Sequence, residues 1–328
     1  MTQELIIVIA LALVFDFLNG MRDASNIVAT MISSRAFSPG TALAITAVAE
    51  FIGPLLFGVV VARTIGDEIV QSDVLTLTVI AAALVGAILW NLITWYFGLP
   101  GSSSHALIGG MVGAVIAGAG FAAIKFGGLN KVLIALFAFP LIGFASGFLM
   151  TRLIYFLVRN ATPRVNDVFK RGQWFTALIM AFGQGTNDAQ KTMGIIALSL
   201  VIGGVLPSFQ VPAWVVVISA AAIAIGTSLA GWRLIRTLGG KFYKIRPLHS
   251  FSTQLSSAGV ILAASLFGVP VSASQVVSSA IIGVGSAERA SKVRWSVAEE
   301  IMMSWLITIP ASGLLAAGVY WLIVSLGG

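Results

Sequence analysis

Apolar residues run along the chain in stretches long enough to cross a lipid bilayer, and short polar turns separate them. A spanning helix needs about 20 mostly apolar residues. The pattern predicts five elements before a polar segment at 159–172 and five after it: 5–37, 41–62, 74–97, 102–121, 132–158, 173–200, 212–231, 251–267, 272–285 and 296–326. We expect the first element to be broken near 19–23. The Gly and Ser residues in 102–121 and 272–285 leave open whether these elements cross fully or are broken or re-entrant helices.

The composition favours a membrane protein and argues against several soluble classes. Of the 328 residues, 58% are hydrophobic and only 9% are charged, and the mean hydropathy is +1.00. A soluble domain carries about 25% charged residues. A soluble enzyme, a disordered protein and a nucleic-acid binder are therefore disfavoured. The predicted fold class is an all-α polytopic membrane protein with about 10–12 helices, depending on how broken or re-entrant segments are counted.

The basic residues predict how the chain is oriented in the membrane. Most of the 19 Lys and Arg residues fall in the polar segment 159–172 and in the loops 233–246 and 289–294. Such loops stay on the cytoplasmic side, which predicts a multi-pass protein of the cell membrane with both termini outside. The first residues lack the basic region of a signal peptide, so we expect the first apolar stretch to be retained. The net charge of +7 is then a topology signal, and no nucleic-acid partner is expected.

The two halves of the chain resemble each other. Residues 17–24 share Phe, Gly, Asp and Ala with 182–189, and 98–105 share Gly, Pro and Ser with 268–275. Each half holds five elements, an odd number, so the second half enters the membrane from the opposite face. Inverted repeats with discontinuous helices at the bilayer midplane are typical of secondary transporters. We therefore divide the chain into a first inverted repeat at 1–158, a cytoplasmic basic linker at 159–172 and a second inverted repeat at 173–328.

Two aspartates lie deep inside apolar stretches, at equivalent positions of the repeat. A carboxylate there costs about 3 kcal/mol or more unless it is paired or hydrated. Asp23 and Asp188 are therefore candidates for binding cations, although a structural salt bridge to Arg22 or Lys191 is the alternative for the two basic neighbours. Hard oxygen ligands suit sodium. The predicted sodium ligands are Asp23, Asn26, Asp188, Asn187, Gln190, Thr192 and Glu50.

Two Ser-rich segments follow Pro100 and Pro270 and open new helices. Ser is a preferred N-cap, and the free amides of a helix start attract anions. Two such starts entering from opposite faces can converge on one tetrahedral oxyanion. Ordinary capping and close helix packing are the alternative for either start alone. The predicted phosphate-binding residues are Asp23, Asn26, Ser102, Ser103, Ser104, Asp188, Ser272, Ser274, Gln275 and Thr186.

Other polar residues in apolar surroundings are candidates for coupling ion movement to transport. A carboxylate in such a place can relay a cation, or it can reach the membrane interface, and an imidazole can transfer protons or simply pack. The chain has no Cys, only two His and no nucleotide-binding loop, so we expect no cofactor and an ion gradient as the energy source. The predicted coupling residues are Glu50, Glu300, Arg22, Lys191 and His105.

These motifs resemble the signatures of the inorganic phosphate transporter (PiT) family, and the resemblance covers essentially the whole chain. They are the stretches 19–26, 98–106 and 185–191. The resemblance implies cation-coupled uptake of inorganic phosphate at the cell membrane, commonly by a homodimer, with Asp23, Asn26, Asp188 and the serines lining the sites. It also implies that Glu50 and Glu300 are acids needed for transport. Arg22 departs from the Asn or His that the family often has there.

The sequence thus predicts that the chain is not an enzyme but a sodium-coupled phosphate symporter working by alternating access. The alternatives are a symporter coupled to protons, carrying phosphate or metal phosphate, and a permease for a related oxyanion such as sulfate. A channel would need a continuous open pore. A membrane-embedded enzyme would need a nucleophile and base in contact, which the adjacent Ser104 and His105 do not establish.

Overall fold

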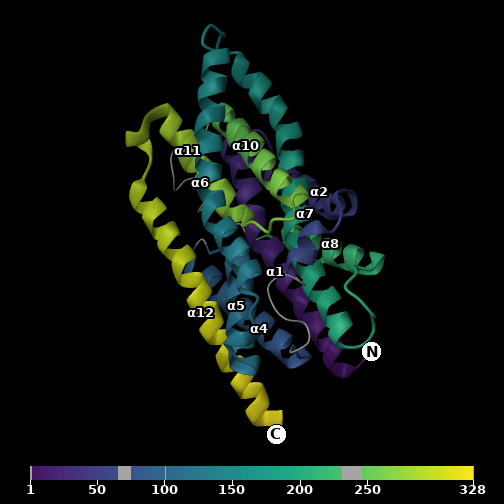
Figure 1. Ribbon diagram of the computed structural model, residues 1–328. Helices are drawn as coiled ribbons and strands as arrows, with labels where there is room; N and C mark the ends of the chain where they lie inside the picture. Colours follow the sequence, from purple (N-terminus) through teal and green to yellow (C-terminus); the bar gives the residue numbers. More distant parts are fainter. Residues whose placement is uncertain (1, 66–74, 100, 231–245, 328) are drawn as a thin grey trace.

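The computed structural model describes residues 2–65, 75–99, 101–230 and 246–327, and within these the side chains of Asn26 and Lys292 are not described. Most of the predicted basic loop 233–246 therefore lies outside the described residues. The elements are helices, as predicted (Figure 1). The long ones are α1 (Gln3–Ser33), α2 (Pro39–Phe57), α4 (Leu77–Phe97), α5 (Ser103–Ala119), α6 (Phe126–Leu157), α7 (Val165–Ile202), α8 (Ala213–Ser228), α10 (Pro247–Leu266), α11 (Ala273–Arg289) and α12 (Trp295–Gly327). Short α3 (Val60–Arg63), η3 (Phe121–Ala123) and η4 (Ala290–Lys292) complete the set.

Five described helices are long and apolar enough to cross a membrane: α1, α2, α4, α6 and α12. Helices α5 and α8 are apolar but shorter. Large apolar side chains are exposed along α6 and α12, including Leu141 at 72% and Leu314 at 76%. Apolar surface of this extent suits contact with lipid rather than water. Figure 1 shows α12 along the outside of the molecule beside α5 and α4, and both termini at the lower end.

Helix α7 differs from these spans because it is polar and enclosed by protein. It packs against α10, α2, α1 and α8, and its residues from 183 to 200 are all buried. A polar side chain at membrane depth is tolerated where it faces protein or a polar cavity rather than lipid. The packing of α7 therefore explains how the chain carries a run of polar side chains through its centre.

The predicted break in the first element is wrong, because α1 continues through Asn19–Asp23 as one helix. Gly20 is a packing residue there and not a helix breaker. A Cβ atom on Gly20 would lie 2.2 Å from the backbone oxygen of Ile223, so only glycine lets α1 and α8 approach this closely. Helix α7 likewise begins at Val165, so the second half of the predicted linker 159–172 is helical. Polarity marked the end of the apolar run, but not the end of the helix.

The real discontinuities lie at the two Ser-rich segments. Helix α4 ends at Phe97, where Gly98 takes the left-handed φ of +68° that favours glycine. Helix α5 then starts at Ser103, with the Ser102 hydroxyl accepting from the His105 amide. The same sequence of events joins α10 to α11, where Gly268 has φ of +69° and the Ser272 hydroxyl accepts from the Gln275 amide. Two helical hairpins result, because α4 packs on α5 and α10 on α11.

Contacts in the two halves are reciprocal. Helix α5 packs against α12 and α11 against α6; α1 packs against α8 and α7 against α2. The close approach of Gly20 to Ile223 has its counterpart in Gly185, whose Cβ would lie 2.5 Å from Cα of Glu50. This is the packing that a repeat leads us to expect. The boundaries 1–158 and 173–328, and the opposite orientation of the halves in a bilayer, stay predictions.

Candidate functional site

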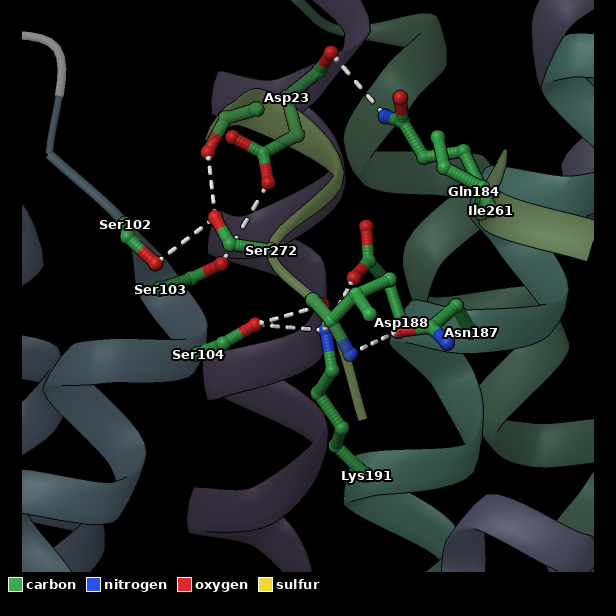
Figure 2. A network of polar contacts seen from close by, with 12 residues as sticks. Asp23, Ser102, Ser103, Ser104, Gln184, Asn187, Asp188, Lys191, Ile261 and Ser272 are labelled. Atoms are coloured by element: carbon green, nitrogen blue, oxygen red, sulfur yellow. Dashed lines mark hydrogen bonds and ion pairs between the residues drawn. The ribbon is translucent and has the colours of Figure 1, made fainter. Parts of the chain in front are cut away.

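The two hairpin tips meet at their serines. The Ser102 hydroxyl donates to the Ser272 hydroxyl at 2.8 Å, although the two residues are 170 positions apart. The hydroxyls of Ser272 and Ser274 lie 3.0 Å apart. Figure 2 shows Ser102, Ser103 and Ser104 on one side, with Ser272 opposite them and Asp23 and Lys191 close by. The structure therefore brings together the two helix starts that the sequence singled out.

Asp23 lies at the edge of this serine cluster. The Ser103 hydroxyl donates to Oδ2 of Asp23 at 3.4 Å, and the side chain is only 4% exposed. Helix α1 carries Asp23, and α7 holds that part of the helix through Gln184, whose amide donates to the Asp23 backbone oxygen at 3.1 Å. A carboxylate acceptor therefore stands beside hydroxyl donors at the hairpin tips.

Lys191 holds the second aspartate. Its ammonium donates to Oδ1 of Asp188 at 2.5 Å, to the Ser104 hydroxyl at 2.7 Å and to the Val271 backbone oxygen at 2.8 Å. Both side chains are about 1% exposed. These three oxygens satisfy the three donors of an ammonium group. The pair is more than a local salt bridge, because it joins α7 to the tips of both hairpins.

Asn187 fixes the second hairpin tip on α7. Its Nδ2 donates to the Ser265 hydroxyl at 3.0 Å, and its Oδ1 accepts from the Val271 amide at 3.2 Å. Val271 precedes the N-cap Ser272, so this amide bond sets where α11 starts. In this arrangement Asn187 holds a helix start, and its predicted role as a cation ligand stays a prediction.

Glu50 lies in a neighbouring network on α2. It is fully buried and accepts from Gln184 Nε2 at 3.4 Å and from the Thr227 hydroxyl of α8. The Thr227 hydroxyl also lies 3.2 Å from the Gly20 backbone oxygen. Gln184 therefore bridges Glu50 to the backbone of Asp23, so Glu50 contacts the site indirectly, through Gln184.

Arg22 and His105 each face one hairpin tip. The Arg22 guanidinium donates to Oδ1 of Asn91 and, at 3.2 Å, to the Gly101 backbone oxygen next to the N-cap of α5. His105 Nδ1 lies 2.8 Å from the Ser102 hydroxyl, and its Nε2 lies 3.5 Å from Gln275 Nε2 of the other hairpin. Both therefore contact the tips from the side, and their part in coupling stays a prediction.

Several predicted site residues lie away from the serine cluster. The Thr186 hydroxyl donates to the Phe182 backbone oxygen and faces Gly53 of α2, and Gln190 Oε1 accepts from the Val61 amide. Glu300 is exposed near the start of α12. Thr192 is buried on α7, one helical turn beyond Asp188. Asn26 belongs to α1, but its side chain lies outside the described part.

Sequence reasoning missed four residues that the contacts bring out. Gln184, Thr227 and Asn91 hold Asp23, Glu50 and Arg22, and nothing local in the sequence distinguishes them from other polar residues in apolar runs. Asp16 did carry a signal: it is an acid within the apolar stretch of α1, as Glu50 is within that of α2. It is 0% exposed and lies two turns from Asp23.

The buried charges of the described residues do not balance. The acids Asp16, Asp23, Glu50 and Asp188 are at most 4% exposed, whereas the only buried Arg and Lys among these residues are Arg22 and Lys191. If all six ionise, two negative charges lack a positive partner. Uncompensated charge in a low-dielectric interior is very unfavourable. The site is therefore suited to taking up cations or protons, above all if an anion joins it.

Comparisons with known proteins all point to one family. A profile of the phosphate transporter family (PHO4) matches residues 19–316. A protein of Rhizobium meliloti (strain 1021), described as a "probable low-affinity inorganic phosphate transporter", is 46% identical over 95% of this chain and 94% of its own length. A Bacillus subtilis (strain 168) protein of the same description is 42% identical over 97% and 96%. A solved structure described as "the sodium-dependent phosphate transporter" superposes with a TM-score of 0.90 at 25% identity, covering 99% of this chain and 100% of that one.

Proposed function

The chain belongs to the inorganic phosphate transporter (PiT/PHO4) family, and we propose that this multi-pass membrane protein imports inorganic phosphate together with sodium by alternating access. As a member of that family it is a transporter of inorganic phosphate and not an enzyme. Sodium coupling is the finer part of the proposal. The imbalance of buried charge supports coupling to a cation or a proton, and the sodium-dependent structural relative favours sodium.

Phosphate would bind at the meeting point of the two hairpin tips. The donors are the hydroxyls of Ser102, Ser103, Ser104, Ser272 and Ser274 and the free amides in the first turns of α5 and α11. Helix N-termini bind phosphate through such amides and through the positive end of the helix dipole. In the present arrangement the Ser102 and Ser272 hydroxyls bond to each other, and phosphate oxygens would take over these bonds.

The positive side chains of the site and the co-transported cations would together compensate the charge of the bound phosphate. Lys191 supplies a tethered cation on Asp188, already held by three oxygens. Arg22 supplies a second near the start of α5. The remaining acids leave a negative interior in which phosphate binding is unfavourable until cations enter. Binding of the two ions would therefore be mutually dependent, which is what coupled transport requires.

Asp23 supports phosphate over sulfate. Phosphate keeps a proton near neutral pH and can donate a hydrogen bond to a carboxylate, whereas sulfate cannot. Asp23 already accepts from Ser103 at the serine cluster, so it is placed to accept from a protonated oxyanion. A permease for sulfate would gain nothing from an acid there.

Labelled-phosphate uptake into proteoliposomes tests the proposal. We expect an inward sodium gradient to accelerate uptake, a proton gradient alone to have little effect, and excess sulfate not to compete. Uptake driven by a proton gradient without sodium would favour the proton-coupled alternative, and equal competition by sulfate would favour the general oxyanion permease. The homodimer and the external position of both termini also stay predictions, which cross-linking in membranes and labelling of terminal tags can check.

A further inference from the structure

Buried, uncharged polar side chains form a column between α1, α7 and α10, on one side of the serine cluster. The column leads toward the end of the molecule where α6 ends and where α7 and α10 begin. We call it the basic end, because it carries Arg159, Arg164 and Arg246. The column residues are at most 4% exposed and are Thr30, Ser34, Gln173, Thr176, Ser250, Gln254 and Ser257.

Hydrogen bonds between side chains of the three helices close the middle of the column. The Thr176 hydroxyl of α7 donates to Oε1 of Gln254 on α10 at 2.7 Å. Nε2 of Gln254 donates to the Thr30 hydroxyl of α1 at 3.0 Å, and the Ser250 hydroxyl donates to the Thr30 backbone oxygen at 2.8 Å. One glutamine therefore connects all three helices through bonds between neutral groups.

The column extends from this middle level in both directions. Toward the basic end, the Ser34 hydroxyl donates to Oε1 of Gln173 at 2.8 Å. Toward the serine cluster, the Ser257 hydroxyl finds no hydrogen-bond partner among the described residues, although it is 0% exposed. Asp23 is seven residues from Thr30, so the two share one face of α1. The column therefore connects the candidate phosphate site with the basic end.

The equivalent positions of the other half of the chain are apolar. The motifs recur at offsets of 165 residues between α1 and α7 and 170 residues between α4 and α10. At these offsets the counterparts of the seven column residues are Ile195, Ser199, Val8, Leu11, Ile80, Leu84 and Ala87. The apolar ones belong to one core cluster or pack against it. Apolar packing thus joins the corresponding helices at the opposite end, so polar side chains are not needed merely to hold three such helices together.

The chemistry of the column suits the passage of an anion. Polar groups in the interior of a membrane protein are unfavourable, and they mark the paths of substrates and ions. Hydrogen bonds between neutral groups contribute little net free energy, because water or a phosphate oxygen can replace either partner. None of the seven column residues is acidic, so none repels phosphate. The arginines of the basic end attract an anion to that mouth of the column.

We propose that phosphate passes between the serine cluster and the basic end through this column. The hydrogen bonds among Thr30, Thr176 and Gln254 close it in the present arrangement, and it opens when they exchange for bonds to water and to phosphate oxygens. The inference rests on the proposed function for its substrate. It adds residues that phosphate contacts on its way, outside the site where it binds.

The chain contains no cysteine, so single cysteines can report whether the column opens. Thr176→Cys, Ser250→Cys and Ser257→Cys would be treated with a membrane-impermeant, negatively charged thiosulfonate in right-side-out and in inside-out membrane vesicles. Asn160→Cys, exposed in the loop between α6 and α7, identifies the vesicles whose basic end faces the reagent. In those vesicles the column cysteines should react at least about tenfold faster than Ser219→Cys, a buried control on α8, because reaction needs an accessible thiolate.

Uptake and binding of phosphate show whether the column serves passage or only structure. Gln254→Met and Thr176→Val keep the side chains near their size and remove their polar atoms. We expect the maximal rate of uptake to fall about tenfold or more, while phosphate binding to the purified full chain changes less than about twofold, since the serine cluster is intact. Ser199→Ala, at the counterpart of Ser34, should change neither.

The outcomes separate the column from the proposed function. Column cysteines that react no faster than Ser219→Cys, or that react only where Asn160→Cys does not, overturn the inference. Wild-type uptake by both polar-to-apolar variants also overturns it, as does phosphate binding that falls as much as uptake; if Gln254→Met does not fold, Thr176→Val decides. Labelling needs no sodium, so if the column cysteines react but wild-type uptake ignores sodium, the column stands and the sodium symport fails.

Discussion

At the scale of single residues, Lys191 and Asp188 form a buried ion pair, and removing one member should affect stability differently from removing both. Removing one member of a buried ion pair leaves the other charge unpaired and costs about 3–5 kcal/mol. We therefore expect Lys191→Met and Asp188→Asn each to lower stability strongly. The double variant should recover much of that loss, because both charges are gone, yet its phosphate uptake should stay at background since the ammonium no longer joins α7 to the tips.

Thermal unfolding in detergent and uptake in proteoliposomes measure the two effects separately. The surface offers a matched control: Arg246 lies 3.8 Å from Glu288 with its side chain 62% exposed, so Arg246→Gln should change stability by less than about 1 kcal/mol. Double-variant stability no better than that of the single variants would show that the pair is not energetically coupled. Uptake by the double variant at the wild-type rate would remove Lys191 from the transport site.

At the scale of elements, the glycines inside α1 and α7 decide how closely the helices approach. Gly20→Ala places a Cβ 2.2 Å from the Ile223 backbone oxygen, which no side-chain rotation relieves, so α1 and α8 must move apart. We expect a loss of at least about 1–3 kcal/mol, the usual cost of overpacking. Gly318→Ala in α12 meets nothing within 4 Å and should be neutral or slightly stabilising. Thermal unfolding of both variants checks the contrast, and similar transitions for the two would contradict the packing argument.

Features set by neighbouring residues could be predicted from the sequence, whereas features set by a facing helix could not. Helix starts at Ser102 and Ser272 were predictable because capping depends on residues within one turn of each other. Gly20 was misread as a break, because a packing glycine and a breaking glycine look alike until the facing helix is known. Asp16 was overlooked although it satisfies the test that picked out Asp23, an acid in an apolar run.

At the scale of the whole molecule, contacts between distant segments assemble the candidate site. Lys191 meets Ser104 across 87 positions and Val271 across 80, so no spacing rule could have predicted its three partners. What the sequence did carry was the recurrence of Asp and Ser motifs at nearly constant offset, which predicted that the halves would present similar groups to each other. The sequence also shows every acidic and basic residue. Their imbalance in the interior appears only in the structure, which shows that four of the acids are buried while most of the described bases are exposed.

That imbalance predicts how the molecule responds to its two ions together. Four buried acids face two buried bases, so phosphate alone adds negative charge to an already negative interior. Sodium that binds first would neutralise part of this negative charge. In choline chloride, phosphate should leave the unfolding temperature nearly unchanged. In sodium chloride, phosphate at a hundred times its dissociation constant should stabilise the protein by about 2.7 kcal/mol. Thermal unfolding in the four salt combinations, with sulfate replacing phosphate as the control, measures this coupling. If phosphate raised the unfolding temperature equally in choline and in sodium, the two ions would bind independently. Independent binding could not couple phosphate uptake to the sodium gradient, because sodium would not be needed for phosphate to bind.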